Sequence, residues 1–219
     1  MIKAVIFDLD GTLIDSMGIW DKVDVDFLKK RNIEVPEDLF VDTESGNSIN
    51  DLAILFKDKF KLAESLDEIK LEWQSMVEDY YRYELKIKPN VIDVLNFLRE
   101  KNIKLAIGTS NSEHLARAVL SSNKVEDYFE FFSAGCQDIK GKPHPDIYLK
   151  AAESIEIAPE NCLVIEDSLV GVQAGKNAQM RVFSIHDDYT GKDLERVIEL
   201  SDKHFQTYSD MHEYFVNKL

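Results

Sequence analysis

Two aspartates near the start of the chain, Asp8 and Asp10, are spaced for shared chemistry. They follow a short, wholly apolar run at residues 4–7, which is typical of a buried strand in a sheet. Side chains two positions apart on an extended chain point the same way, so both carboxylates can project from the carboxyl end of this strand. Two acids that close repel each other unless a cation or a shared proton intervenes. The pattern suits a metal-assisted site in which one carboxylate is a nucleophile and the other an acid/base, although a plain strand end with an Asp-Gly turn would also produce it.

A second stretch with chemical potential, Thr109, Ser110 and Asn111, follows another apolar run at residues 104–108. A hydroxyl and backbone amides at a strand-to-helix turn can bind an anion, because the first turn of a helix carries unpaired N–H groups and the positive end of the helix dipole. The alternative is that Ser110 or Asn111 only caps the following helix.

Lys142 lies in a third stretch, in which Pro143 and Pro145 bracket the start of a predicted helix and stiffen the backbone after the lysine. A lysine held in this way can place its charge against a phosphoryl oxygen and a neighbouring carboxylate. The alternative is an ordinary solvated lysine in a loop. We expect His144, between the two prolines, to be structural.

Glu166 and Asp167 form a fourth stretch, directly after the apolar run at residues 162–165. Magnesium prefers a tight octahedron of oxygen ligands with several waters retained, and Asp8, Asp167 and one backbone carbonyl would supply a suitable face. The alternative is that the two acids only favour the N-terminus of the helix that follows. Each of the four structural alternatives is acceptable alone. Together they would require four strand ends or adjoining loops to carry an acid pair, a hydroxyl, a lysine and a second acid pair by accident.

Short apolar runs alternate with helical patterns along most of the chain, which predicts a parallel sheet covered on both faces. In such a sheet, ligands bind beyond the carboxyl ends of the strands, where the four stretches above would meet. The predicted strands lie at 4–7, 104–108, 131–134, 162–165, 181–185 and 203–205. The predicted helices of this part lie at 91–101, 111–122, 145–156 and 169–178, with a last one from residue 209.

An insertion of about 90 residues separates the first two strands, far more than one crossover helix needs. Its apolar spacing predicts helices at 17–31, 51–60 and 66–84. We therefore expect an inserted helical cap over residues 16–86, with residues 1–15 and 87–219 as the core. We expect the cap aromatics to form the interior of the cap rather than a ligand site; they are Trp20, Phe27, Trp73, Tyr80 and Tyr81.

The composition excludes several classes of partner. The 219 residues carry a net charge of −15, which disfavours nucleic acid and anionic membranes. No run approaches the roughly 18 apolar residues of a membrane span. The two cysteines, Cys136 and Cys162, are too few for a disulfide framework, so we expect free thiols and a cytoplasmic location. We expect a monomer or a weak homodimer.

Four motifs occur in order along the chain, with the helical insertion after the first: DLDGTL, TSN, GKPHPDIY and VIEDSLVGVQAGKNAQM. In these motifs the chain resembles the haloacid dehalogenase superfamily, and most of all its branch with an α-helical cap, which holds β-phosphoglucomutase and small-metabolite phosphatases. The resemblance spans the core. It implies an α/β fold, with a Rossmann-like parallel sheet as the core and an inserted α-helical cap, and it implies phosphotransfer rather than dehalogenation.

The resemblance also implies roles for the two aspartates. Asp8 would attack phosphorus and become an aspartyl phosphate, while Asp10 would protonate the leaving alcohol and then activate water for the second step. One difficult displacement would thereby become two easier ones. The cap would close over the site, exclude bulk water and select the substrate.

The remaining core residues have implied roles in holding the phosphoryl group and a metal ion. Thr109 would hydrogen-bond the phosphoryl group, aided by the amides of Ser110 and Asn111. Lys142 would offset the charge of the nucleophile and of the phosphate. The implied cofactor is Mg²⁺, and its implied ligands are Asp8, the Asp10 carbonyl, Asp167 and, directly or in support, Glu166.

The cap favours a phosphatase over a mutase. A mutase that holds a sugar bisphosphate needs a cation in its cap. β-Phosphoglucomutases share a histidine early in the first cap helix and an arginine in the loop before the next. In this chain Trp20 lies near the position of the histidine, and Ile49 lies where the arginine is expected. From residue 14 to residue 85 the chain has 9 basic and 18 acidic residues. We therefore expect a Mg²⁺-dependent phosphatase acting on a small phosphorylated metabolite, with Trp20, Asn47 and Ile49 near the substrate. The alternatives are a sugar phosphomutase of the β-phosphoglucomutase type and a catalytically silent phosphometabolite-binding protein.

Overall fold

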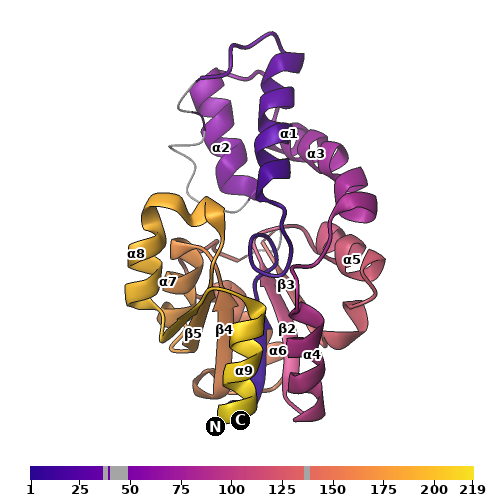
Figure 1. The fold of residues 1–219 in the computed structure, drawn as a ribbon. Helices are drawn as coiled ribbons and strands as arrows, with labels where there is room; N and C mark the ends of the chain where they lie inside the picture. The colour runs from indigo at the N-terminus through magenta and orange to yellow at the C-terminus, as the bar shows by residue number, and fades with distance from the viewer. Residues whose placement is uncertain (37–38, 40–48, 136–138) are drawn as a thin grey trace.

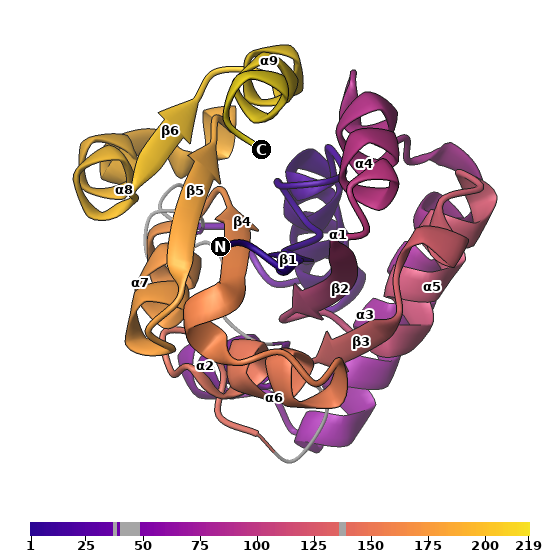
Figure 2. The same ribbon diagram turned by 90° about the horizontal axis from the view of Figure 1, so that it is seen from below.

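A six-stranded, fully parallel sheet with the order β3-β2-β1-β4-β5-β6 lies in the lower part of the molecule in Figure 1, and all six strands are labelled in Figure 2. The computed structural model describes residues 1–36, 39, 49–135 and 139–219. The strands are β1 (Ala4–Phe7), β2 (Lys104–Thr109), β3 (Phe131–Ala134), β4 (Cys162–Glu166), β5 (Arg181–Ile185) and β6 (Lys203–Phe205). The predicted α/β class with a Rossmann-like sheet is confirmed, and the strand bounds agree with the prediction to within one residue.

Helices cover both faces of this sheet, as the view from below shows (Figure 2). Side chains alternate along a strand, so in β1 the even and odd positions enter two different cores: Val5 and Phe7 pack with the helices of one face, Ala4 and Ile6 with those of the other. The first face carries α4 (Val91–Glu100), α5 (Glu113–Ser122) and α9 (Tyr208–Lys218). The second carries α6 (Asp146–Ser154), α7 (Leu169–Asn177) and α8 (Leu194–Leu200).

Between β1 and α4, the chain forms a group of helices beyond the carboxyl edge of the sheet (Figure 1). They are α1 (Met17–Lys30), α2 (Ile49–Phe60), α3 (Leu66–Asp79) and the π-helical turn η1 (Tyr80–Glu84). Their interior contains three aromatic rings, with centroids 5.4 Å apart for Phe27 and Trp73 and 5.0 Å apart for Phe56 and Trp73. Phe27 and Trp73 therefore lie where the sequence predicts them, inside the helical group.

Within the insertion, two predicted helices differ from the structure by more than one residue. The helix predicted at 66–84 is divided, because the α-helix ends at Asp79 and a π-helical turn continues the chain. The helix predicted from residue 51 begins at Ile49. Short 3₁₀ turns complete the described structure, at Glu126–Tyr128, Pro159–Asn161 and Asp188–Asp193. Among the described residues, no helix combines the length and the apolar character that a membrane crossing requires.

The strand register brings the four chemical stretches to one edge. Phe7 of β1 lies beside Ile107 of β2 and Ile165 of β4, and all three strands run the same way. The residues that follow these strands therefore leave the sheet side by side. The backbone N–H of Asp8 donates to the carbonyl of Ile165 at 3.0 Å, which extends the pairing of β1 and β4 to the first acidic residue.

Candidate active site

A buried lysine joins two of the predicted acidic positions. Lys142 Nζ lies 2.6 Å from Asp8 Oδ1 and 2.5 Å from Glu166 Oε1, and all three side chains are buried. Burial alone would lower the pKa of Lys142, but the two carboxylates outweigh it and raise the pKa, so the lysine stays charged. The ordinary solvated lysine, considered above as the alternative, is therefore wrong for Lys142.

Glu166 is held by hydrogen bonds at both of its oxygens. Oε1 accepts from Lys142 and, at 2.8 Å, from the Tyr148 hydroxyl, while Oε2 accepts from the backbone N–H groups of Asp167 at 2.9 Å and Ser168 at 3.0 Å. Burial alone would raise the pKa of Glu166, but Lys142 and these donors lower it. A Cβ on Gly171 would lie 1.7 Å from Oε1, so this position needs glycine. Glu166 therefore serves as a fixed anion that orients Lys142.

Asp167 lies beside Asp8 and Glu166 in a cluster suited to a cation. One ligand atom from each of the three carboxylates lies within 4.8 Å of the others. Asp167 Oδ1 accepts from Thr12 Oγ1 at 2.6 Å. Burial, followed by the charges of Glu166 and Asp8, raises the pKa of Asp167 well above its ordinary value.

The pKa of Asp8 is raised for similar reasons. Burial raises its pKa to about 7, with Lys142 acting in the opposite direction and Glu166 adding to the rise. Because Lys142 is shared with Glu166, one positive charge faces three buried carboxylates. Buried carboxylates require compensation, and an all-oxygen donor set is what Mg²⁺ prefers. The residues present therefore fit a magnesium ion.

Asp10 turns toward the loop after β2 and toward the helices above the sheet. Its Oδ1 accepts from Ser16 Oγ at 2.6 Å and from the Tyr81 hydroxyl, and its Oδ2 accepts from Asn111 Nδ2 at 3.0 Å. Ser16 is thus engaged by Asp10 although it precedes α1, and its side chain makes no capping bond there. Three side chains, from the segment before α1, from η1 and from the loop after β2, therefore donate to this carboxylate.

The last residue of β2 and the loop after it contribute two buried side chains to the site, those of Thr109 and Asn111. Thr109 Oγ1 accepts from the backbone N–H of Asn111 at 3.1 Å, which turns the chain sharply after the strand. The N-cap of α5 is Ser112, whose Oγ accepts from the N–H of Leu115. The alternative that Ser110 or Asn111 caps this helix is therefore wrong, because the helix begins two residues later than predicted.

The cap positions predicted near the substrate have different outcomes. Trp20 Nε1 donates to the Tyr81 hydroxyl at 2.9 Å, so Trp20 is one residue removed from Asp10. Ile49, the first residue of α2, is buried within the apolar core, and its proximity to substrate stays a prediction. Asn47 lies outside the described residues. The structure adds Tyr81: its ring is buried in the core as predicted, but its hydroxyl reaches Asp10.

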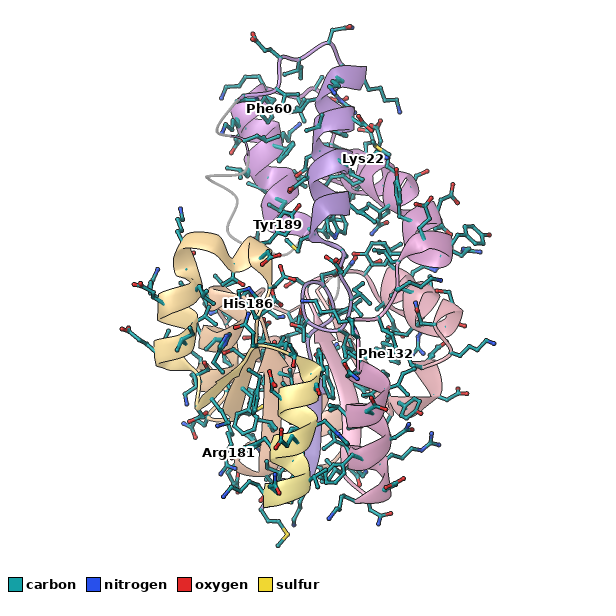
Figure 3. The ribbon with its side chains drawn as sticks, viewed as in Figure 1. Lys22, Phe60, Phe132, Arg181, His186 and Tyr189 are labelled. Carbon is teal, nitrogen blue, oxygen red and sulfur yellow. The ribbon has the colours of Figure 1, made fainter. Side chains whose placement is uncertain are left out.

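The helices that lie beyond the sheet edge also contact the rest of the molecule away from the carboxylates. Tyr189, after β5, lies just beneath α1 (Figure 3), and its side chain interacts with that of Asp21. A Cβ on Gly18 would lie 3.1 Å from the Tyr189 hydroxyl, so α1 approaches the core closely here. Nearby, Lys88 Nζ, on the return segment before α4, lies 2.7 Å from Asp187 Oδ2 and also donates to the carbonyl of Gly11.

An α/β fold with a buried lysine among carboxylates at the carboxyl edge of its sheet defines an enzyme site rather than a plain structural edge. The chain belongs to the haloacid dehalogenase-like hydrolase family, whose family model matches residues 2–179. It is 32% identical over 195 residues to a phosphorylated carbohydrates phosphatase of Thermotoga maritima, with 88% of this chain and 90% of that protein covered. The predicted family is confirmed.

Two solved structures share the fold. One is CbbY from Rhodobacter sphaeroides in complex with phosphate, with a TM-score of 0.84, 21% identity and 96% of each chain covered. The other is a β-phosphoglucomutase from Clostridium difficile, with a TM-score of 0.80, 20% identity and 100% of each chain covered. At this level of identity, both likenesses concern the fold alone.

Proposed function

We propose that this protein is a Mg²⁺-dependent phosphatase that hydrolyses a small phosphorylated carbohydrate through an aspartyl phosphate on Asp8. The observation that carries the proposal is the buried contact of Lys142 with Asp8 and Glu166, with Asp167 completing the carboxylate cluster. Activity as a phosphatase also fits the name of the Thermotoga maritima relative, which acts on phosphorylated carbohydrates.

In the first step, a carboxylate oxygen of Asp8 forms a bond to phosphorus as the bond from phosphorus to the substrate oxygen breaks. Lys142 stabilises the charge on the phosphoryl oxygens and on the attacking carboxylate. Asp10, in its protonated form, gives its proton to the departing alkoxide. The products of this step are the free alcohol and phosphorylated Asp8, with Asp10 left as a carboxylate.

In the second step, Asp10 takes a proton from a water molecule as the water oxygen bonds to phosphorus. The bond between phosphorus and Asp8 breaks, inorganic phosphate leaves, and Asp10 is protonated again, ready for the next cycle. Thr109, at the end of β2, and the backbone amides of Ser110 and Asn111 bind the phosphoryl oxygens in both steps.

The magnesium ion would be held by Asp8, Asp167 and the main-chain carbonyl of Asp10, with Glu166 in support. When bound, it would act as a Lewis acid and offset the negative charge that accumulates on the phosphoryl group. Glu166 is proposed to support the ion without coordinating it, because both of its oxygens already accept hydrogen bonds. The donors are Lys142, Tyr148, Asp167 and Ser168.

Four basic side chains of the cap already have partners within the cap, which favours hydrolysis over the mutase alternative. Lys30 and Arg31 pair with Glu72, Arg82 pairs with Glu78, and Lys22 donates to Tyr80. Trp20 of α1, whose indole donates to the Tyr81 hydroxyl beside Asp10, is uncharged. A second phosphate would therefore have to compete with these existing partners for the positive charge of the four basic residues.

We further propose residues 16–86 as the cap and residues 1–15 with 87–219 as the core, since the helices of α1 to η1 lie together beyond the sheet edge (Figure 1). We also propose a cytoplasmic location, which is supported by the free and buried thiol of Cys162, and a monomer or weak homodimer.

The direct test compares the wild type with Asp8→Asn on p-nitrophenyl phosphate and on a panel of sugar phosphates. We expect phosphate release that requires Mg²⁺, that stops when EDTA is added, and that Asp8→Asn lowers by at least about 10³-fold. The matched control is Asp188→Asn, whose side chain is 97% exposed and which should keep full activity. Equal turnover by the wild type and Asp8→Asn would refute the assignment, and efficient conversion of β-glucose 1-phosphate in the presence of its bisphosphate would favour the mutase.

A further inference from the structure

A tyrosine from the cap side of the site, Tyr81, is bonded directly to Asp10. We propose that Tyr81 is a positioning residue, which fixes the Asp10 carboxyl group in the orientation needed to protonate the leaving alcohol. This inference rests on the proposed function, because it takes Asp10 as the acid of a phosphatase.

The direction of each hydrogen bond at the Tyr81 hydroxyl follows from the chemistry of its neighbours. The Trp20 indole can only donate, and it lies 2.9 Å from the hydroxyl oxygen. Asn111 Nδ2 lies at the same distance, and its orientation is fixed because Asn111 Oδ1 accepts from the N–H of Ser112 at 2.7 Å. Two donors therefore occupy the lone pairs of the hydroxyl, and its single proton is committed to Asp10 Oδ1.

The hydroxyl keeps this proton because of where it lies. The Tyr81 side chain is fully buried, so bulk water does not compete for the proton that its hydroxyl donates to Asp10. Its donated bond acts together with that from Ser16 at Oδ1 and that from Asn111 at Oδ2.

The local backbone explains how a cap residue reaches the edge of the sheet. Tyr81 lies in the π-helical turn η1, between the end of α3 and the return to the core. π-Helical turns are rare and occur often at functional sites, since the wider turn redirects side chains. Within this turn Tyr81 is fully buried, whereas Tyr83 is 68% exposed. Asp10 is therefore held jointly by the cap, through Tyr81, and by the core, through Asn111.

Two substrates with different leaving groups distinguish a loss of Asp10 positioning from a general loss of active-site structure. An alkyl phosphate such as β-glycerol phosphate needs a proton on its leaving oxygen, whereas p-nitrophenolate leaves without much help from an acid. The quantity to compare is kcat/KM, because it reports the transfer of the phosphoryl group to Asp8 and not the later hydrolysis. The variants are Tyr81→Phe, which removes only the hydroxyl, and Tyr83→Phe as the matched control from the same turn.

For Tyr81→Phe we expect kcat/KM to fall about 30-fold on the alkyl phosphate and less than about 3-fold on p-nitrophenyl phosphate, as a fraction of the 10²–10⁴-fold that a general acid contributes. Asp10→Asn should show the same pattern with larger losses, and Tyr83→Phe should match the wild type. Trp20→Phe, which removes one donor to the Tyr81 oxygen, should show the pattern with smaller losses and serves as the test if Tyr81→Phe does not fold.

Three results would overturn the inference. Equal losses on the two substrates would indicate a merely structural role, and unchanged kinetics of Tyr81→Phe would exclude any role. In both cases a wild type that is active and an Asp8→Asn variant that is inactive would leave the proposed function intact. A wild type without phosphatase activity would overturn the function and the inference together.

Discussion

At the scale of single residues, Lys142 is the side chain on which the site depends most. It is buried and contacts Asp8 and Glu166, so it offsets the charge of the proposed nucleophile and of Glu166, which holds the lysine in place. A buried carboxylate that loses its partner is costly, and removal of one member of such a group destabilises a protein by about 3–5 kcal/mol.

Lys142→Met should therefore lower both activity and stability. We expect kcat to fall about 10²–10³-fold, the usual effect of removing one electrostatic group aimed at the reacting atoms. The free energy of unfolding, measured with urea, should fall by about 3 kcal/mol. Lys140→Met, at an exposed position in the same loop, is the matched control. Activity of Lys142→Met within tenfold of the wild type would contradict the role given to this lysine.

The sequence predicts the site residues that lie at or after the ends of strands. It does not predict the side chains that form hydrogen bonds to them. Asp8, Lys142 and Glu166 come together as predicted because the strand order and register carry them to one edge. Tyr148 on Glu166 and Tyr81 on Asp10 were not predicted as site residues. Each has a ring that packs in an apolar core, and the position of a hydroxyl at the end of a buried ring depends on tertiary packing.

At the scale of secondary-structure elements, the strands were predictable and the break in the third cap helix was not. Buried positions in this helix recur at Ile69, Trp73 and Val77, and Tyr81 continues the series with the same spacing of four. An α-helical turn and a π-helical turn bury the same positions over so short a stretch, so the apolar pattern does not distinguish them. The π-helical turn matters for the proposed function because Tyr81 lies in it and directs its hydroxyl to Asp10.

Helix α1 carries a carboxyl group whose burial should make stability depend on pH. Burial, with a further contribution from Asp21, raises the pKa of Asp24 to about 7 from an ordinary value of 3.8. Between these two values the folded protein keeps a proton that the unfolded chain releases. Since the folded state binds more protons in this window, stability falls as the pH rises from about 4 to about 7.

Asp24→Asn should remove this pH dependence. A shift of this size corresponds to ~4 kcal/mol, and partial exposure of Asp24 to solvent reduces the expected gain to about 2 kcal/mol. We expect the variant to be more stable than the wild type by this amount near pH 8 and equally stable near pH 4, in urea unfolding. Asp26→Asn, at an exposed position of the same helix, should show no such gain. A constant difference at all pH values would contradict the explanation.

At the scale of the whole molecule, charge and fold point to a cation as part of the working protein. The net charge is −15, and buried carboxylates meet at the one edge where strands β1 and β4 end. A cation that binds the folded state alone stabilises it by mass action, by about 2.7 kcal/mol at a hundredfold excess over Kd.

Mg²⁺ should accordingly raise the melting temperature of the wild type in a concentration-dependent way. Asp167→Asn should lose most of this response, because Asp167 is a proposed ligand. Asp202→Asn, in an exposed ion pair with Lys176, should respond like the wild type. The same Mg²⁺-dependent rise in Asp167→Asn and in the wild type would place the ion elsewhere on the acidic surface.

The overall arrangement was predicted more completely than the contacts between its parts. A parallel sheet with an inserted helical group follows from alternating apolar runs and one long insertion, both visible in the sequence. The contact of α1 with Tyr189 and the bonds of Asp10 to Ser16 and Tyr81 depend on how helices pack above the sheet, which periodicity alone does not specify.

The central claim is that Asp8 carries the phosphoryl group during turnover, and trapping this species tests it most directly. Asp10→Asn should transfer phosphate from p-nitrophenyl phosphate to Asp8 but hydrolyse the product slowly, since the base for the second step is missing. After an acid quench, mass spectrometry should find one phosphoryl group on the peptide that contains Asp8, and none in the Asp8→Asn/Asp10→Asn double variant. Release of phosphate by the wild type, with no phosphoryl group on this peptide in any variant, would contradict the account.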